Sequence, residues 1–287
     1  MIVTDEGDLY LSDLNSKSER KIATNGIWRA RFVKDGLIAA TRRQETNKGK
    51  WTNELLLMNF DGDVVSKIDR KDKSDFFLEV SGNGRYLVLA PPDQGLSVYS
   101  VSQGAMLKTI RRRESPPLVA TDRSGLLIAE CLTDWAFRIL RIDEKTKEVS
   151  QTLGPTDAKA GRFGLSSLGF GHGQLTLATG GYYGNISLWD TKKGSRLTCF
   201  KIRHGAPIFI YPFADGRILS VLQARYKPDE DAIVNRIAIF DKKGREIFTQ
   251  RLPSRPIDEG CAHYNAETGT LAVGVDTGKI VFVKLPS

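Results

Sequence analysis

Short runs of apolar, often β-branched residues alternate with polar turn residues along the whole chain. Runs such as residues 37–40 and 86–89 are short and closely follow a turn glycine. No segment of ten or more residues repeats its apolar positions at the helical spacing of about 3.6, whereas short bounded runs are typical of strands. The pattern therefore predicts an all-β protein.

A small polar residue followed by glycine recurs just before an apolar run. Such pairs suit tight hairpins, because Gly, Asn and Asp readily adopt the positive φ that type I′ turns require. Successive glycines lie 41 to 53 residues apart, a range that overlaps the roughly 40–45 residues of a four-stranded propeller blade. The six pairs are Asp35-Gly36, Asn83-Gly84, Ser124-Gly125, His172-Gly173, Asp215-Gly216 and Thr268-Gly269.

A further apolar strand follows each of these runs, and several end in Asp and a basic, glycine-containing turn. The clearest is Asn-Ile-Ser-Leu-Trp-Asp at Asn185–Asp190, followed by Gly194. This strand resembles the signature third strand of a WD40 repeat. His204 stands where that family has its Gly-His histidine, although Arg203 replaces the glycine. The Trp-Asp pair occurs once, while the spacing covers nearly the whole chain, so the resemblance implies a WD40-like β-propeller.

Blades of four strands, named a to d from the centre outward, are expected at about 27–69, 75–111, 116–153, 165–201 and 206–251. Residues 2–5 and 8–14 match strands b and c, and residues 257–285 supply strands a to c of a last blade. We thus predict one domain over residues 1–287, an all-β, seven-bladed β-propeller whose terminal blades can be incomplete. Three explanations for the incomplete ends stay open: further sequence outside this chain, three-stranded terminal blades, or a strand donated by a partner, since open edges are pairing templates.

Composition narrows the setting without naming a function. The net charge of +8 allows an acidic protein, nucleic acid or an anionic membrane surface as partner, but it serves solubility equally well. No apolar run approaches the ~18 residues of a membrane helix, and the first residues lack the basic start of a signal peptide. We expect a cytoplasmic protein without a membrane span. Cys131, Cys199 and Cys261 are too few and too widely spaced for a disulfide framework or a Cys-x-x-Cys zinc site.

Motifs that carry chemistry are sparse. The histidines are His172, His204 and His263, and the chain has no His-Glu-x-x-His, Gly-x-Ser-x-Gly or Walker A motif. Cys261 and His263 share one face of a predicted strand, where a thiolate–imidazole pair or half of a metal site is conceivable. Packing or a polar lining is the simpler interpretation. We therefore expect no enzymatic activity, no metal and no cofactor.

One set of connections differs in composition from the other turns. The b–c connections carry large aromatic residues, and the d–a connections, which open on the same rim in WD40-like propellers, carry basic ones. Tyr, Trp and Arg dominate binding hot spots, although the rings could instead pack over the blade ends. The candidate partner-binding residues are Trp51 in a long loop at 44–53, Arg111, Arg112, Arg113, Trp135, Tyr182, Tyr183, Arg203, His204, and Tyr226 in a loop at 225–234.

Three functions are compatible with this rim. The leading hypothesis is a non-catalytic protein-protein interaction scaffold or a subunit of a larger complex. RNA or single-stranded nucleic-acid binding is the alternative, with bases stacked on the aromatic rings and phosphates held by arginines; basic residues on the opposite rim weaken it. A propeller hydrolase with a metal in its channel would need several inward Asp, Glu, His or Asn side chains, and the predicted inner strands are mostly apolar.

Overall fold

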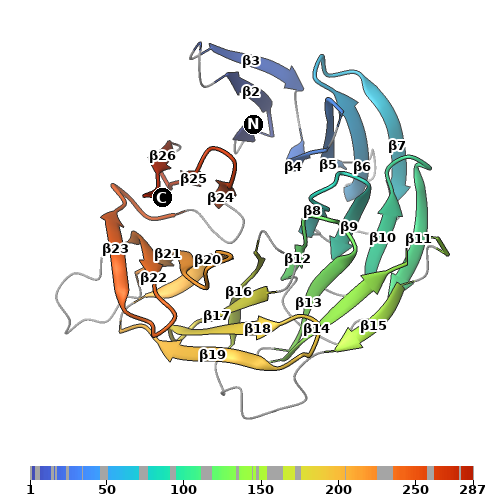
Figure 1. The fold of residues 1–287 in the computed structure, drawn as a ribbon. Helices are drawn as coiled ribbons and strands as arrows, with labels where there is room; N and C mark the ends of the chain where they lie inside the picture. The colour runs from blue at the N-terminus through green and yellow to red at the C-terminus, as the bar shows by residue number, and fades with distance from the viewer. Residues whose placement is uncertain are drawn as a thin grey trace. The chain divides into compact units, whose positions relative to one another are not determined.

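The computed structural model of the chain consists of antiparallel β-strands and turns, and no helix occurs among the residues it describes (Figure 1). The prediction of an all-β protein is confirmed. The described residues form two compact units, residues 1–126 with 142–149 and residues 127–141 with 150–287. The structure describes residues 2–286 apart from 4–6, 14–15, 17, 24–25, 34, 46–50, 71–76, 91–94, 111–117, 134–135, 144, 147–148, 154–163, 172–175, 204, 225–234, 257–261 and 278.

The first unit is built from meanders in which each strand pairs with the next in sequence. Its sheets have the orders β1-β2-β3, β4-β5-β6-β7 and β8-β9-β10-β11. The strands are β1 (Ile2–Val3), β2 (Leu9–Asp13), β3 (Ser18–Ala23), β4 (Ile27–Phe32), β5 (Leu37–Glu45), β6 (Trp51–Asn59), β7 (Val64–Arg70), β8 (Phe77–Val80), β9 (Tyr86–Ala90), β10 (Leu96–Ser100), β11 (Ala105–Ile110) and β12 (Val119–Thr121).

The second unit repeats the same organisation. Its sheets have the orders β16-β17-β18-β19, β20-β21-β22-β23 and β24-β25-β26, and a further sheet has the order β12-β13-β14-β15. The strands are β13 (Leu127–Thr133), β14 (Ala136–Ile142), β15 (Val149–Leu153), β16 (Leu165–Phe170), β17 (Thr176–Gly181), β18 (Asn185–Asp190), β19 (Arg196–Lys201), β20 (Ala206–Pro212), β21 (Ile218–Gln223), β22 (Arg236–Phe240), β23 (Glu246–Arg251), β24 (Ala262–Asn265), β25 (Thr270–Gly274) and β26 (Ile280–Lys284).

The predicted hairpin turns are present wherever the structure describes them. Asp35 and Gly36, between β4 and β5, have φ values of 62° and 77°, and the Val33 N–H donates to the Leu37 carbonyl at 2.8 Å. Asp and Gly adopt positive φ at little cost, so the turn is made by the residue types that the sequence predicts for a hairpin. Positive φ is also found at the glycines of the other described pairs, Gly84, Gly125, Gly216 and Gly269, while His172-Gly173 lies outside the described residues.

The loop predicted at 44–53 is shorter than expected. Strand β5 runs to Glu45 and β6 begins at Trp51, and the ladder continues through the pairs Gln44–Thr52 and Glu45–Trp51. Polar side chains suggested a loop, but backbone groups pair in a ladder whatever side chain they carry. An ion pair between Arg42 and Glu54, with 2.6 Å between Nη2 and Oε2, also joins the two strands near this end.

Alternation along the strands places apolar side chains on both faces of each sheet in the first unit. Leu55 and Leu57 of β6 belong to a cluster with Leu87 and Leu89 of β9. Their neighbour Leu56 faces the other way, into a cluster with Leu9 of β2. Because side chains point alternately to the two faces of a strand, a run such as Leu55-Leu56-Leu57-Met58 joins one sheet to the sheets on either side.

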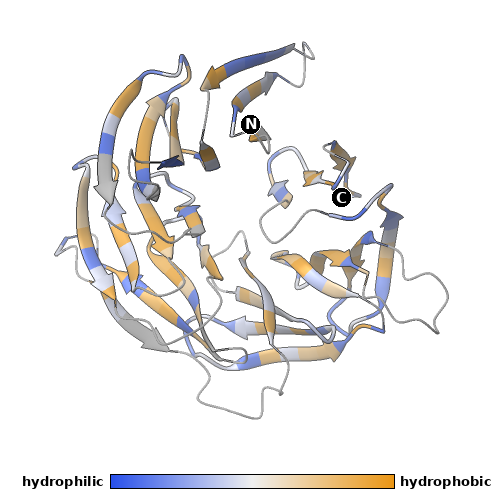
Figure 2. Cartoon of the chain, turned by 180° about the vertical axis from the view of Figure 1, so that it is seen from behind, coloured by the Kyte–Doolittle hydropathy of each residue, from blue (hydrophilic) through white to orange (hydrophobic). Residues whose placement is uncertain are grey.

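The second unit is packed by the same alternation. Ala238 and Phe240 of β22 share a cluster with Ile186 of β18, and Ile237 and Ile239 of β22 face the β24-β25-β26 sheet through a different cluster. Figure 2 shows the apolar colouring of these middle strands. Successive meanders stacked face to face through shared apolar clusters are the arrangement of β-propeller blades, and each unit is built in this way.

The described residues also bear on the expectations about membrane spans and disulfides. No helix long and apolar enough to cross a membrane is found among the described residues. Cys131 is buried and Cys199 is exposed, and neither forms a disulfide; Cys261 lies outside the described residues. The expectation of a single domain stays a prediction.

Candidate functional site

A tight turn presents Tyr182 and Tyr183 between β17 and β18. The Gly184 N–H donates to the Gly181 carbonyl at 2.8 Å, which closes a four-residue turn with the two tyrosines at its centre. The Tyr182 N–H donates to the Gly164 carbonyl at 2.8 Å, so the turn is also tied to the segment that precedes β16. Tyr182 and Tyr183 nevertheless keep 37% and 54% of their surface exposed. The backbone of the turn is fixed while both rings reach solvent.

Arg203 lies at the same end of the sheet as this turn. The N–H of Ile202, its neighbour in sequence, donates to the Gly184 carbonyl at 2.9 Å, and the Arg203 side chain is exposed. A Cβ at position 184 would lie 2.8 Å from Ile202 Cγ1 and 2.9 Å from the Ile202 carbonyl oxygen. Glycine at 184 therefore permits the close approach that brings the tyrosine turn and the strand exit at Arg203 together.

We call Tyr182, Tyr183 and Arg203, which lie at the same end of the β16-β17-β18-β19 sheet, the tyrosine rim. Two amphipathic rings and a guanidinium on a hydrogen-bonded hairpin can stack, accept and donate hydrogen bonds, and pair with a carboxylate or a phosphate. The rings cost little side-chain entropy on binding because each has only two rotatable angles. The patch is suited to recognising a ligand surface.

The other predicted rim residues are not tested by this geometry. Trp51 is the first residue of β6 and pairs with Glu45 across the ladder, at an end of the sheet and not in an open loop. The remaining predicted residues, Arg111, Arg112, Arg113, Trp135, His204 and Tyr226, lie outside the described residues. The structure thus brings Tyr182, Tyr183 and Arg203 together, and the wider rim stays a prediction.

The Trp-Asp strand has a structural role. Trp189 is buried, its Nε1–H donates to Thr179 Oγ1 at 3.1 Å, and its ring meets that of Phe137 edge-on with 5.2 Å between centroids. Asp190 Oδ1 accepts the N–H groups of Lys192 and Lys193. These backbone hydrogen bonds, with that from Lys193 the stronger, lower the pKa of Asp190. The pair anchors β18 and caps the turn after it.

An aromatic cluster that the sequence reasoning did not anticipate lies on the inner strands of the second unit. The ring of Tyr211 lies 5.6 Å from that of Phe213 and 4.8 Å from that of Tyr264, with Phe213 and Tyr264 also 5.6 Å apart. The Arg217 guanidinium lies 5.2 Å from the Phe213 ring centroid, and its Nε donates to Asp215. Burial raises the pKa of the Tyr264 hydroxyl. Arg217 is the cation that lies over this cluster. Because Tyr211 belongs to β20 and Tyr264 to β24, the cluster packs the β20-β21-β22-β23 sheet against the β24-β25-β26 sheet.

A signal for this cluster was present in the sequence. Tyr211 and Tyr264 each precede a turn glycine, Gly216 and Gly269, by the same five positions. Equal positions in successive blades lie side by side, so equal spacing predicts contact. Neither residue lies in a b–c or d–a connection, where the aromatic candidates of the sequence were found.

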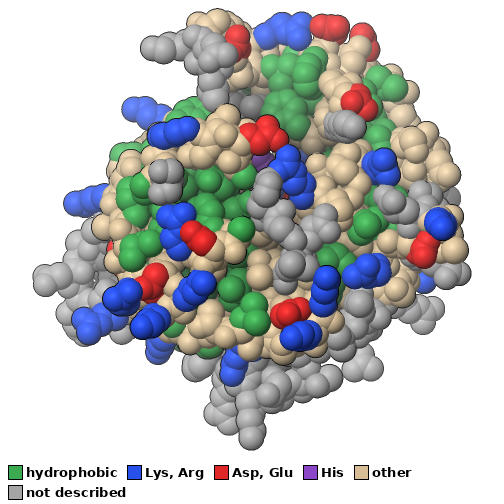
Figure 3. Space-filling view, viewed as in Figure 1, with side chains coloured by type: hydrophobic (Ala, Val, Ile, Leu, Met, Phe, Trp, Pro, Cys, Tyr) green, Lys and Arg blue, Asp and Glu red, His purple; other side chains and the backbone are tan. Residues whose placement is uncertain are grey.

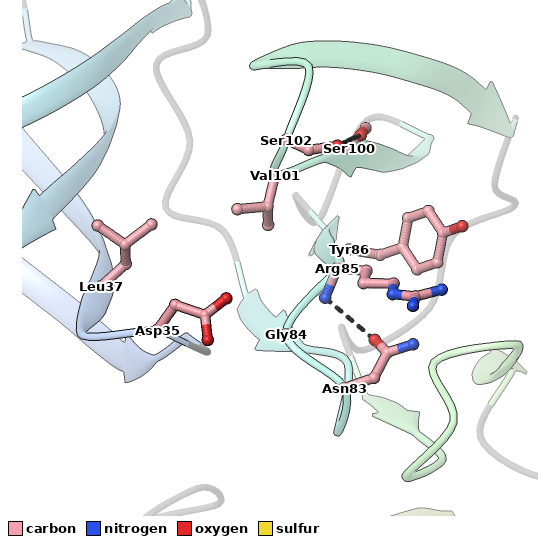
Figure 4. Close-up of a pocket in the computed structure, with 9 residues that line it drawn as sticks. All are labelled: Asp35, Leu37, Asn83, Gly84, Arg85, Tyr86, Ser100, Val101 and Ser102. Atoms are coloured by element: carbon pink, nitrogen blue, oxygen red, sulfur yellow. Dashed lines mark hydrogen bonds between the residues drawn. The ribbon is translucent and has the colours of Figure 1, made fainter.

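The first unit has a shallow groove between turns of neighbouring sheets (Figure 4). It encloses about 460 Å³ and is lined by residues of the β4–β5 turn, the β8–β9 turn and the β10–β11 turn. Asn83 Oδ1 accepts the Arg85 N–H at 3.0 Å and so belongs to the turn itself. The Asp35 carboxylate points into the gap, while the Arg85 side chain extends away from it (Figure 4). The groove is open and its polar side chains belong to three separate turns, so it does not resemble the enclosed, mostly apolar pocket of a small-molecule site.

Neither a cluster of like-charged side chains nor one of metal-ligating residues indicates a second site among the described residues. Lys and Arg side chains on the face shown in Figure 3 are scattered among acidic and apolar ones. No group of three or more His, Cys, Asp or Glu residues that could hold a metal occurs within the described ranges. His263 lies on β24, and Cys261 lies outside the described residues.

No family model matches the chain, and no curated protein matches it.

Proposed function

We propose that this chain is a seven-bladed, WD40-like β-propeller that acts as a non-catalytic protein-protein interaction scaffold, a subunit of a larger cytoplasmic assembly. The observation that carries the proposal is the tyrosine rim, because it exposes two tyrosines on a turn whose backbone is held by three hydrogen bonds of 2.8–2.9 Å, with the exposed Arg203 at the adjacent exit of β19. Preorganised aromatic and arginine side chains supply most of the binding energy in protein interfaces.

The pattern of strands and sheets supports the proposed blade number and the WD40-like family. Five sheets of four strands and two of three strands among the described residues support seven blades, the first and last incomplete. The Trp189–Thr179 hydrogen bond and the capped turn after Asp190 are features that a WD40-like third strand would need. The absence of catalytic motifs in the full sequence favours binding over chemistry.

The proposal is tested by quantitative affinity purification of a rim variant, Tyr182→Ala/Tyr183→Ala/Arg203→Ala. A matched control, Leu197→Ala/Ile247→Ala, removes two side chains of similar exposure from the outer strands. We expect a stoichiometric protein partner whose affinity falls on the order of thirtyfold with the rim variant, since hot-spot residues contribute 2 kcal/mol or more. Unchanged affinity in the rim variant, or equal loss in the control, would contradict the proposal.

The same material tests nucleic-acid binding. If the rim held RNA or single-stranded DNA, affinity would fall steeply with salt, because each phosphate contact releases counterions. The scattered positive charge in Figure 3 makes the protein partner the better supported of the two. Binding of a protein partner that changes little between 50 and 200 mM salt, roughly the range over which phosphate-dominated binding weakens most, would favour it further.

A further inference from the structure

We propose that the groove between the β4–β5, β8–β9 and β10–β11 turns accepts a lysine side chain that a partner protein presents. All residues that line this groove belong to the first unit. The tyrosine rim belongs to the second unit. The groove is therefore a second interaction surface, with its own chemistry, in addition to the one proposed above.

The carboxylate of Asp35 supplies the negative charge of the groove. It points into the gap (Figure 4), and Asp35 is exposed. No hydrogen bond or ion pair joins this carboxylate to another of the described residues. Asp215 and Asp241, in turns of the second unit, differ in this respect, because each accepts a hydrogen bond from an arginine Nε at 2.6 Å. A cation that enters the groove therefore meets a carboxylate without a described partner.

The strand register shows that Ser102 and Lys242 occupy equivalent positions in two different sheets. In each sheet the first residue of the second strand follows the turn glycine by two positions and pairs with the last residue of the third strand. Ser102 and Lys242 each stand two positions beyond that last residue. The pairs are Tyr86–Ser100, after Gly84, and Ile218–Phe240, after Gly216.

In the second unit a lysine side chain lies on the turn glycine. A Cβ added to Gly216 would lie 2.8 to 3.3 Å from Cε, Cγ and Cδ of Lys242, so the methylene stem of Lys242 packs directly against the turn. Burial tends to raise the pKa of the Asp215 carboxyl, but hydrogen bonds from Arg217 and the charges of Arg217 and Lys242 lower it. The chain thus contains its own example of a lysine that covers this turn and reaches toward a carboxylate.

In the first unit the equivalent position holds a short side chain. The hydroxyl of Ser102 lies 3.3 Å from that of Ser100, and the place that the lysine stem fills in the second unit forms part of a groove of about 460 Å³. Leu37 and Val101 line the groove with apolar side chains. Lysine packs its methylene stem along apolar surface and keeps its ammonium in a polar setting, so these two residues suit the stem and Asp35 suits the ammonium.

The shape of the groove favours a lysine on a polypeptide over a free amine. The groove is open and is bordered by three turns, which leaves room for the chain on both sides of the lysine. An exposed charge pair alone contributes little to binding, whereas a protein partner adds contacts with the turns. The Arg85 guanidinium, the other charge of the lining, extends away from the gap (Figure 4).

The test uses the ¹⁵N-labelled full chain and the peptide acetyl-Gly-Ser-Lys-Ser-Gly-amide, with binding followed by amide chemical shifts. We expect saturable shifts at Gly84, Arg85 and Ser102. The same peptide with norleucine in place of lysine keeps the apolar stem without the charge. It should bind about fivefold more weakly, because a charge pair contributes up to about 1 kcal/mol and 1.4 kcal/mol is tenfold. n-Butylammonium, which has the charged side chain without the polypeptide, should also bind about fivefold more weakly or less.

Two variants and a matched control locate the binding. Asp35→Asn removes the charge and keeps a residue type that tolerates positive φ, so it should bind both peptides equally. Ser102→Lys places a lysine at the position equivalent to Lys242 and should prevent binding of the lysine peptide. Gln103→Lys adds the same charge one position further along, outside the lining of the groove, and should bind within about twofold of the unaltered chain, a change of about 0.4 kcal/mol. If circular dichroism shows that Asp35→Asn does not fold, the comparison of Ser102→Lys with Gln103→Lys still decides.

Four results would overturn the proposal. Equal binding of the lysine and norleucine peptides would show that the groove does not recognise the charge, and so would undiminished binding by Asp35→Asn. Equal loss in Ser102→Lys and Gln103→Lys would show that added charge, and not a filled groove, weakens binding. Binding of n-butylammonium as tight as that of the peptide would make the ligand a small amine. Absence of shifts at the groove residues would place any binding elsewhere. None of these outcomes depends on the tyrosine rim.

Discussion

Replacement of Gly184 by alanine tests the geometry that supports the tyrosine rim. Gly184 has φ +81°, and an added Cβ would lie 2.8 Å from Ile202 Cγ1 and 2.9 Å from the Ile202 carbonyl oxygen. The substitution therefore combines a left-handed backbone, which costs an L-residue roughly 1–2 kcal/mol, with overpacking against a neighbouring strand exit, which costs typically 1–3 kcal/mol. We expect Gly184→Ala to lower the free energy of unfolding by about 3 kcal/mol.

Two other glycines of the same unit separate these contributions. Gly269 has φ +61°, and the atom nearest to an added Cβ is Lys284 Nζ at 3.8 Å, so Gly269→Ala should cost only the backbone strain, about 1 kcal/mol. Gly169 has no positive φ, but its Cβ would lie 1.9 Å from the Ile210 carbonyl oxygen on the adjacent inner strand β20. Gly169→Ala isolates the steric contribution and should cost about 3 kcal/mol, at the upper end of overpacking.

The measurement is urea unfolding of the full chain and the three variants, followed by circular dichroism. Shifts in the midpoint at constant slope report changes in stability. Binding of the partner by the folded variants gives a second readout, because Gly184→Ala should displace Tyr183 and Arg203 while Gly269→Ala should leave them in place. If Gly184→Ala costs no more than Gly269→Ala, the close approach of Ile202 to the turn is wrong, and with it the rigid support of the tyrosine rim.

Two further predictions concern carboxylates held by hydrogen bonds. The backbone N–H of Arg245 is the main group that lowers the pKa of Asp241. A carboxyl group whose pKa is lowered by folding stabilises the fold above its unfolded pKa, and this stabilisation is lost as pH falls through the folded pKa. Thermal melts should therefore show Asp241→Asn less stable than the unaltered chain at pH 7, with the difference shrinking as the pH is lowered through the acidic range. Burial tends to raise the pKa of Glu54, and hydrogen bonds from Lys67 and Arg42 together hold it below its usual range. Glu54→Gln should therefore lower the free energy of unfolding by about 2 kcal/mol at neutral pH, less than the full cost of breaking a buried pair; a neutral effect in urea unfolding would contradict this ion-pair network.

The turn glycines allowed most of the hairpins and strands to be predicted from the sequence. Asp35-Gly36 predicts a hairpin because few other pairs adopt two successive positive φ values cheaply, and both residues have them. The runs between turns then fall into strands whose alternate residues face neighbouring sheets, as Leu55 and Leu56 do. Turn preferences and the alternation of buried residues depend on only a few neighbouring residues. Both can therefore be predicted from a single sequence.

Features that depend on pairing between distant segments were less accessible. The residues around Gln44 and Thr52 are polar and suggested a loop, yet they continue a ladder, because ladder hydrogen bonds use the backbone. The contact between Tyr211 and Tyr264 joins strands more than fifty residues apart, and only their equal distance from the turn glycines indicates it. Tyr182 and Tyr183 were found from sequence because they occupy a glycine-flanked turn, where a bulky residue has no core to enter.

The tyrosine rim selects a partner through its side chains. The rings and charges that a partner places against Tyr182, Tyr183 and Arg203 decide how well it binds, so single substitutions at these positions should change the choice of partner.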